Sequence, residues 1–264
     1  MTDYTALMVQ TDGPVARITL NRPDTRNAFD EVVIAELTRA FVAAGTAPAV
    51  RAVVLAANGP AFCAGANLNW MRRAADFTCE QNVQDASGLA AMLRAIHDCP
   101  KPVIARVQGD AYAGGMGLVA ACDMAVAAES AGFCLSEVKI GLIPATISPY
   151  VIRAMGERAA QRYFLTGERF SAAEALRIGF VHEVAAPEAL DAHIDVICKP
   201  LLAAGPAAVC ACKRLIADVA GREIDDALIA QTVQAIADIR VSPEGREGVR
   251  AFLEKRKPGR LASD

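Results

Sequence analysis

The sequence repeats one order of segments up to about residue 185: two short extended runs, then a helical segment. The run at 15–20 alternates apolar and polar residues, and the run at 52–57 is apolar throughout. A short, wholly apolar run is typical of a strand that is buried on both faces, as in a parallel sheet. From Pro187 onward the pattern is helical. The order of segments therefore predicts an α/β fold with a helical C-terminal region.

Apolar spacing places three helices within this order. The helix expected after residue 30 carries Val33, Leu37, Ala40, Phe41 and Ala44 on one face. A long helix from about Glu80 to Asp98 is predicted to carry Val83, Ala86, Ala90, Leu93 and His97 on one side. Ser148 precedes Pro149, which predicts a helix start capped by the serine hydroxyl, and Gly156 is expected to interrupt that helix.

Composition narrows the class of protein. The 264 residues are 53% hydrophobic, enough for one large domain or a domain with an appendage, and the net charge of −3 argues against a nucleic-acid partner. No run of 18 apolar residues occurs, and the N-terminus lacks a signal pattern, so no membrane association is expected. The eight cysteines form no C-x-x-C pair and most lie among apolar residues, which predicts free thiols, no metal site and a cytoplasmic protein.

A glycine-rich segment, Tyr112–Val119, follows the apolar run at 102–107 and contains Gly114, Gly115 and Gly117. Glycine has no Cβ, so a ligand can approach the main chain closely there. The first N–H groups of a helix lack intrahelical partners and carry partial positive charge. The segment is therefore a candidate site for a bound or developing anion.

Two familiar kinds of site fit this segment poorly. Gly115 to Ala120 matches the dinucleotide pattern G-x-G-x-x-A, but 108–113 separate it from the strand, and the segment that follows is too short for a crossover helix. A serine hydrolase is also disfavoured, because no G-x-S-x-G motif occurs and the three histidines have ordinary helical or strand contexts.

A second junction of small residues, 58–67, also follows an apolar run. If Ala66 and Gly114 lie side by side, their N–H groups can hold a thioester oxygen as it gains negative charge. Glu137 follows apolar residues 133–135, and partial burial there is expected to raise its pKa into a range useful for proton transfer. The alternative is an exposed carboxylate or an ion pair with Lys139.

Four motifs together resemble the enoyl-CoA hydratase/isomerase (crotonase) superfamily. The resemblance covers about residues 7 to 257, with the motifs in the order that the family has them. They are Asn21-Arg22-Pro23, the segment 62–68, Gly114-Gly115-Met116-Gly117 with Cys122-Asp123, and Glu137 with Gly141-Leu142-Ile143-Pro144.

The resemblance implies a spiral of ββα units within residues 1–195, and a helical region, 196–264, that forms homotrimers or hexamers. It implies acyl-CoA thioester substrates without a metal or redox cofactor. Ala66 and Gly114 match the oxyanion-hole residues, and Glu137 matches the second of two catalytic glutamates. The positions that match CoA contacts are Arg26, Ala28, Ala64, Leu68, Phe252 and Lys255, and the basic turn of Arg22 and Arg26 suits the CoA phosphates on charge grounds.

The sequence departs from the family pattern at two positions. Gly117 stands where many hydratases have their first glutamate, and Asn67 stands where the family usually has aspartate after the oxyanion-hole alanine. Hydration of a 2-enoyl thioester needs water activated at Cβ and a proton delivered to Cα, so Glu137 would do both or be helped by another residue. Some enoyl-CoA isomerases use a single glutamate to move a proton between carbons.

Residues 67–73 and 140–150 are also similar to bacterial methylglutaconyl-CoA hydratases and related enzymes. Those substrates carry a second carboxylate, distant from the thioester, which would pair with a positively charged side chain. Arg72, Arg73 or Lys139 could supply that charge; the alternative is that these three side chains are solvated charges on the surface. The leading hypothesis is a hydratase for a branched or glutaconyl-type 2-enoyl-CoA. The alternatives are an enoyl-CoA isomerase and an acyl-CoA-binding protein with reduced catalysis. The acyl pocket is predicted to include Trp70, Met116, Gly117, Leu142 and Pro144, each of which could equally be ordinary core.

Overall fold

Six strands form the main sheet of the computed structural model, which describes residues 4–259. Their order is β1-β2-β3-β5-β7-β10; β1 is antiparallel to β2, and every other neighbouring pair is parallel. The strands are Leu7–Asp12 (β1), Val15–Leu20 (β2), Ala52–Ala57 (β3), Val103–Val107 (β5), Met124–Ala128 (β7) and Glu183–Ala185 (β10).

A smaller sheet has the order β4-β6-β8-β9, in which β4, β6 and β8 are parallel and β9 is antiparallel to β8. Each central strand of the main sheet is followed by a strand of the small sheet, and then by helical structure. This is the predicted ββα order. The strands are Ala61–Cys63 (β4), Asp110–Tyr112 (β6), Gly132–Cys134 (β8) and Arg169–Ser171 (β9).

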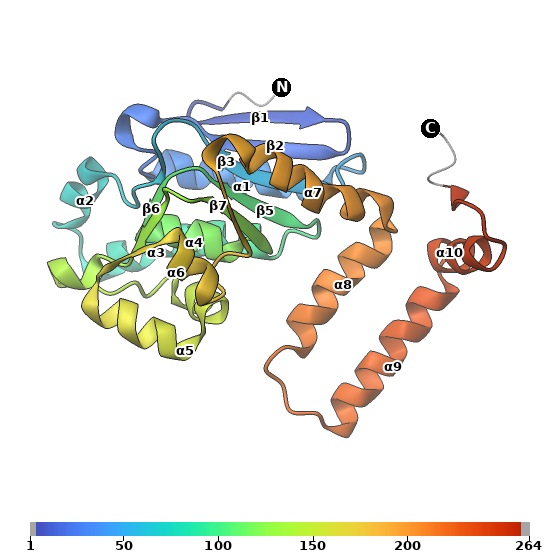
Figure 1. Cartoon of the computed structure of the whole chain (residues 1–264). Helices are drawn as coiled ribbons and strands as arrows, with labels where there is room; N and C mark the ends of the chain where they lie inside the picture. The colour runs from blue at the N-terminus through green and yellow to red at the C-terminus, as the bar shows by residue number, and fades with distance from the viewer. Residues whose placement is uncertain (1–3, 260–264) are drawn as a thin grey trace.

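Helices cover both sheets (Figure 1): α7 packs across β3, β5 and β7, whereas α1 packs against α3 and the β1–β2 edge. The α-helices are Glu31–Thr46 (α1), Leu68–Ala74 (α2), Cys79–His97 (α3), Gly114–Ala121 (α4), Ser148–Thr166 (α5), Ala172–Arg177 (α6), Leu190–Ala203 (α7), Pro206–Val219 (α8), Asp226–Val241 (α9) and Pro243–Leu253 (α10). Three short 3-10 helices are Pro23–Thr25 (η1), Glu137–Ile140 (η2) and Pro187–Ala189 (η3).

The core follows the apolar runs of the sequence. All six residues of β3 are buried, as a strand covered on both faces requires, and the predicted face of α1 is buried as well. Four cysteines are buried in this core, and all eight are free thiols, although Cys79 and Cys212 are exposed. Burial raises the pKa of the Cys63 thiol to about 12, and its Sγ donates to the carbonyl oxygen of Asn27.

One predicted helix face is covered over only part of its length, and one predicted helix cap is wrong. Only Met92, Leu93 and Ile96 of α3 are buried, and Val83 is 61% exposed, because apolar spacing sets which residues share a face but not whether another element covers it. The Ser148 hydroxyl does not cap α5; it donates to the carbonyl oxygen of Ala145, because the chain enters this helix already in the helical conformation at Ile147. Gly156 does interrupt α5, with φ of 76°.

A C-terminal arm of α8, α9 and α10 extends away from the sheets (Figure 1). Lys213 of α8 holds it to the body through the Asp123 carboxylate, at 2.7 Å, and the Lys101 carbonyl, at 3.1 Å. The division predicted after residue 195 falls within α7, whereas the arm begins at the α7–α8 bend. Within residues 4–259 no single helix is long and apolar enough to span a membrane; one pair bent by 109°, Pro187–Ala203 with Pro206–Val219, passes by length and composition only.

Candidate active site

Three of the predicted site residues follow neighbouring parallel strands of the small sheet. Ala66 comes after β4, Gly114 after β6 and Glu137 after β8, each within three residues of the strand's carboxyl end. The carboxyl ends of parallel strands lie at one edge of a sheet, which is where ligands bind in open α/β sheets. Residues far apart in the sequence therefore meet at one edge.

The chain around Ala66 is held by an isolated parallel bridge to Phe29. The Phe29 N–H donates to the carbonyl oxygen of Gly65, and the Asn67 N–H donates to the carbonyl oxygen of Phe29, both at 2.9 Å. In this pairing the Gly65 carbonyl and the Asn67 N–H point toward Phe29, and the N–H of Ala66 points to the opposite side. That N–H is therefore directed away from the pairing segment.

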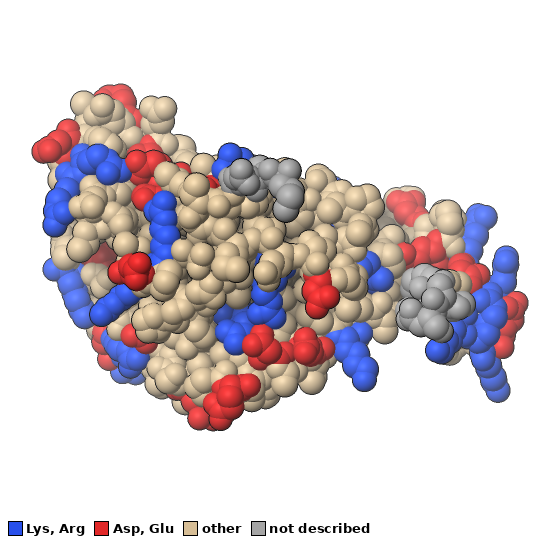
Figure 2. Space-filling model, turned by 90° about the horizontal axis from the view of Figure 1, so that it is seen from above, with Lys and Arg blue, Asp and Glu red and all other residues tan. Residues whose placement is uncertain are grey.

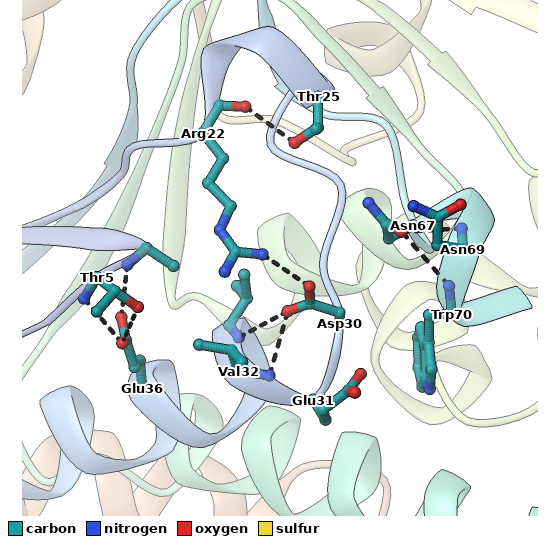
Figure 3. A network of polar contacts seen from close by, with 12 residues as sticks. Thr5, Arg22, Thr25, Asp30, Glu31, Val32, Glu36, Asn67, Asn69 and Trp70 are labelled. Carbon is teal, nitrogen blue, oxygen red and sulfur yellow. Dashed lines mark hydrogen bonds and ion pairs between the residues drawn. The ribbon is translucent and has the colours of Figure 1, made fainter. Parts of the chain in front are cut away.

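Asn67, one of the two departures from the family pattern, is the N-cap of α2. Its side-chain oxygen accepts from the N–H of Asn69 at 2.9 Å and of Trp70 at 3.4 Å (Figure 3). Asparagine and aspartate cap helices about equally well. The substitution of Asn for Asp therefore preserves the start of α2.

We expect Asn67→Ala to lower the free energy of unfolding by about 1 kcal/mol, the usual cost of losing an N-cap. Asn67→Asp should stay close to the starting protein, because its carboxylate can accept the same two N–H groups. Urea unfolding of the three proteins followed by circular dichroism measures both effects. Equal stability of the alanine and asparagine forms would contradict the capping role.

Gly114 begins α4, immediately after a residue with an unusual backbone conformation. Ala113 has φ of 48° and ψ of −120°, and its N–H donates to the carbonyl oxygen of Cys134 at 2.8 Å. Non-glycine residues at positive φ are strained, and surrounding contacts must hold them there. The N–H of Gly114, as the first residue of the helix, has no intrahelical acceptor. The N–H of Gly114 is therefore available to donate a hydrogen bond to a ligand at the start of α4.

The two small-residue junctions lie side by side, which is the condition for two donors that act on one oxygen. A Cβ placed on Gly65 would be 3.1 Å from the Cβ of Ala113 and 3.6 Å from the nitrogen of Gly114. A Cβ placed on Gly115 would be 2.4 Å from the carbonyl oxygen of Cys63. Glycine at these positions allows the two backbones to approach, which brings the N–H of Ala66 and that of Gly114 into one small region.

Glu137 is the first residue of η2 and is only partly accessible. Its Oε2 is buried and, among residues 4–259, has no hydrogen-bond partner. Burial raises the pKa of this carboxyl, against a smaller opposing effect of its own backbone N–H. The alternative of an ion pair with Lys139 is wrong, since none joins them in the described chain. A buried carboxyl without a partner is poised to exchange a proton.

The space beside Gly117 is already filled. A Cβ on Gly117 would lie 2.3 Å from Cγ2 of Ile147 and 3.5 Å from Cδ2 of Leu93, and Ile147 is 2% exposed. Position 117 is a glycine, and the space that a glutamate side chain would need there is occupied by Ile147. No pattern in the sequence links residues 117 and 147, so sequence reasoning missed Ile147.

The other predicted pocket residues have mixed environments. Trp70 is buried, with its indole N–H donating to Asp85 at 2.9 Å and its ring centroid 5.9 Å from that of Phe29. Leu142 is 54% exposed, and its N–H donates to the carbonyl oxygen of Glu137 at 3.0 Å. Met116 and Pro144 are both buried. Leu142 thus contacts Glu137 directly, whereas Trp70 contacts Phe29 and Asp85.

Four predicted CoA contacts lie near Ala66. The Ala64 N–H donates to the carbonyl oxygen of Arg26 at 3.0 Å, so their two segments run side by side; Ala28 is buried there, and Leu68 is 68% exposed. Arg22 forms an ion pair with Asp30 at 2.7 Å (Figure 3), whereas the Arg26 side chain is exposed and has no ion pair in the described chain. Arg26 is therefore the cation of this turn that is available to a phosphate.

The other two predicted CoA contacts, Phe252 and Lys255, lie at the far end of the arm. Phe252 is 81% exposed, and its helix α10 packs against α8 and α9, away from α4 and α2 (Figure 1). One chain does not bring them to the site. The same end of the arm has a hollow of about 520 Å³ lined by Arg240, Arg246 and Arg250, and basic side chains gather there in Figure 2. Sequence reasoning did not identify these arginines.

Comparison with known proteins agrees with this geometry. The model of the enoyl-CoA hydratase/isomerase family matches residues 10–260. This chain belongs to the enoyl-CoA hydratase/isomerase family. Its structure is similar to that of an enoyl-CoA hydratase from Shewanella pealeana, with a TM-score of 0.94 and 44% identity over 97% of this chain and 96% of the other.

Two curated relatives extend the comparison. A Thermus thermophilus protein with an enoyl-CoA hydratase name is 35% identical, covering 95% of this chain and 99% of its own. The mevalonyl-coenzyme A hydratase sidH of Aspergillus fumigatus is also 35% identical, covering 91% and 89%. The family membership confirms the crotonase-like α/β fold.

Proposed function

We propose that this protein is an enoyl-CoA hydratase that adds water across the 2,3 double bond of an enoyl-CoA thioester. The observation that carries the proposal is the convergence of Ala66, Gly114 and Glu137 at the carboxyl ends of three adjacent strands. Such a reaction requires two backbone donors and a carboxyl that can exchange a proton, and the Oε2 of Glu137 is buried without a hydrogen-bond partner in the described part of the chain.

In the proposed mechanism the N–H groups of Ala66 and Gly114 donate to the thioester oxygen. Glu137 removes a proton from water as the water oxygen bonds to Cβ, and the electron pair of the double bond moves toward the thioester, giving an enolate. The two donors stabilise its negative charge, a contribution typically worth several kcal/mol. Glu137 then gives its proton to Cα, which restores the carboxylate. Water adds across the double bond and no electrons are gained from or lost to another reactant, so no redox cofactor is required. The two N–H donors are proposed to stabilise the enolate charge without a metal ion.

A branched or glutaconyl-type acyl group, such as methylglutaconyl, is the proposed substrate class. The likeness of 67–73 and 140–150 to glutaconyl-type hydratases supports it, as does the branched acyl group in the name of the sidH relative. Arg73 is already paired with Glu31, at 2.6 Å, and Arg72 donates to Asn69. Lys139 has no ion pair within residues 4–259, and it lies two residues after Glu137. Lys139 is therefore favoured as the cation for the distal carboxylate.

An enoyl-CoA isomerase is the second candidate, and the filled space beside Gly117 favours it. Ile147 occupies the position from which a second carboxylate would act, which leaves Glu137 as the proposed proton carrier. One carboxylate is sufficient to move a proton from one carbon to another. The two reactions differ in whether water enters the product.

A panel of enoyl-CoA thioesters that includes methylglutaconyl-CoA separates the candidates. Loss of the enoyl ultraviolet absorbance, with a 3-hydroxyacyl-CoA detected by mass spectrometry, supports hydration. Conversion of a 3-enoyl to a 2-enoyl thioester without a change in mass supports isomerisation. Tight binding without turnover of any member would leave an acyl-CoA-binding protein and would overturn the proposed reaction.

We propose a cytoplasmic location, and we propose that the arm assembles the protein into homotrimers or hexamers. Its exposed apolar residues include Ile224, Val233 and Phe252, a kind of surface that usually marks an interface. Assembly would bring Phe252 and Lys255 of one copy to the CoA bound by another, which is the arrangement that their distance from Gly114 requires. Analytical ultracentrifugation measures the oligomeric state.

The pH dependence of kcat/KM is expected to report on Glu137. As the base it must be ionised, and burial raises its pKa above the ordinary value of 4.5, so activity should fall on acidification at a higher pH than for an exposed carboxyl. The folded state holds the Glu137 proton more tightly than the unfolded state does. The free energy of unfolding therefore falls as the pH rises from the pKa of Glu137 in the unfolded chain to its pKa in the folded protein. Values of kcat/KM measured from about pH 4 to about pH 8, a range that extends well above the pKa of an exposed glutamate, give the pH at which activity falls on the acidic side. A limb at the pKa of an exposed carboxyl would contradict the assignment.

A further inference from the structure

We propose that Phe29 is a positioning residue that sets the relative placement of the two N–H groups assigned to the thioester oxygen. The inference deepens the proposed function and rests on it, because those groups matter only if a carbonyl oxygen binds between them. Phe29 lies on neither junction in the sequence, yet it contacts both. Its main chain holds the Ala66 junction, and its side chain packs on Gly114.

The main-chain contact fixes the direction of the first donor. Phe29 accepts from Asn67 and donates to Gly65, and these two bonds clamp the peptide groups on both sides of Ala66. Asn67 is itself held as the N-cap of α2. With both flanking peptides fixed, the N–H of Ala66 has little rotational freedom, which is the property an oxyanion donor needs before substrate arrives.

The side-chain contact fixes the second donor. A Cβ on Gly114 would lie 2.2 Å from Cζ and 2.7 Å from Cε1 of the Phe29 ring, so the ring rests directly against the glycine. The ring therefore limits how closely α4 approaches the Ala66 junction. A smaller side chain at 29 would leave room for the helix start to shift, and catalytic geometry is sensitive to displacements of about 1 Å.

The ring is itself buttressed. Phe29 is 2% exposed, and its ring lies at 57° to that of Trp70, with centroids 5.9 Å apart. The indole N–H of Trp70 is bonded to Asp85 of α3 at 2.9 Å. The Phe29 ring is kept in one position by its packing against Trp70, which is itself held by the hydrogen bond to Asp85. The chain of contacts runs from α3 through Trp70 and Phe29 to the start of α4.

Phe29→Leu tests the proposal, with Phe41→Leu as the matched control. Phe41 is equally buried, at 1% exposure, and lies in α1. Both variants are expected to lose stability through the same truncation, measured by thermal unfolding. Only Phe29→Leu is expected to lower kcat by about tenfold or more, with KM and the affinity for the thioester changed less than about twofold, since donor geometry acts mainly on the transition state.

A second measurement reads the donors directly. The carbonyl stretching frequency of a bound enoyl-CoA, recorded by isotope-edited infrared difference spectroscopy, falls when N–H groups polarise the oxygen. Phe29→Leu is expected to return that frequency toward its value in solution, and Phe41→Leu is expected to leave it shifted. A purely structural role for Phe29 would change the melting temperature and not this frequency.

A third variant pair tests the ring contact itself. Gly114→Ala keeps the backbone N–H but drives a methyl into the Phe29 ring, so it is expected to abolish most activity. Adding Phe29→Ala removes the obstacle, and the double variant is expected to be more active than Gly114→Ala alone. Such a rescue requires that the two residues act through one contact.

The outcomes separate the two proposals. The inference is overturned if Phe29→Leu lowers kcat no more than Phe41→Leu and leaves the carbonyl frequency of the bound thioester as it is in the unaltered protein, or if the double variant is no more active than Gly114→Ala. If the unaltered protein turns over no enoyl-CoA, the proposed reaction fails, and the carbonyl frequency of a bound thioester alone decides the role of Phe29. If no acyl-CoA binds at all, both are overturned.

Discussion

Replacing Glu137 with glutamine is expected to lower kcat by about 10²–10⁴-fold, the usual contribution of a positioned acid–base group. Glutamine has nearly the same shape but exchanges no proton at neutral pH. Affinity for the CoA ester should be retained, because the proposed CoA contacts and the two N–H donors are unchanged. Folding stability should stay the same or rise, since the buried Oε2 has no partner in the described chain and its charge is costly to bury.

Glu129→Gln is the matched control, because Glu129 is an exposed carboxylate at the turn after β7. It is expected to leave kcat and stability unchanged. Steady-state kinetics, thioester binding by calorimetry and thermal unfolding, measured on both variants, distinguish a chemical role from a structural one. A near-normal kcat in Glu137→Gln would refute the proposed mechanism, even if the family assignment stands.

Introducing the missing glutamate at position 117 is expected to destabilise the protein rather than to restore a second catalytic carboxylate. The new Cβ would lie 2.3 Å from Cγ2 of Ile147, and neither residue is near solvent. Overpacking a core costs roughly 1–3 kcal/mol, and burying an unpaired polar group adds roughly 1–3 more. The free energy of unfolding of Gly117→Glu should therefore fall by about 3 kcal/mol or more.

The control is Gly88→Ala in α3, where the nearest atom to a new Cβ is 3.9 Å away, so that change should be neutral or slightly stabilising. Gly117→Glu combined with Ile147→Ala removes the clash and is expected to recover part of the lost stability. If the combined variant also hydrates enoyl-CoA faster, the isoleucine is what prevents a second carboxylate here. Undiminished stability in Gly117→Glu alone would show that the space is not filled.

Local sequence patterns were enough to predict much of the fold. The apolar run at 52–57 is a fully buried strand, as its own residues indicate, and each of the two small-residue junctions follows a strand, as its local sequence indicates. That the junctions lie side by side depends on the pairing of β4 with β6, which joins residues about 50 positions apart. The raised pKa of Glu137 also follows from its local context, since the residues before it are buried. Local context did not decide which part of α3 is covered: Val83 belongs to the regular apolar spacing but is 61% exposed.

The sequence by itself determined which groups are available: two small-residue junctions, one carboxyl after an apolar strand, and a glycine where a glutamate is common. Only the tertiary structure decided what surrounds them. Ile147 fills the space at Gly117, and Phe29 joins the two junctions, through contacts between residues 30 and 85 positions apart. Such contacts depend on how strands and helices are stacked, and they leave no periodic trace in the chain, because a packed core constrains volume and shape rather than the spacing of residues.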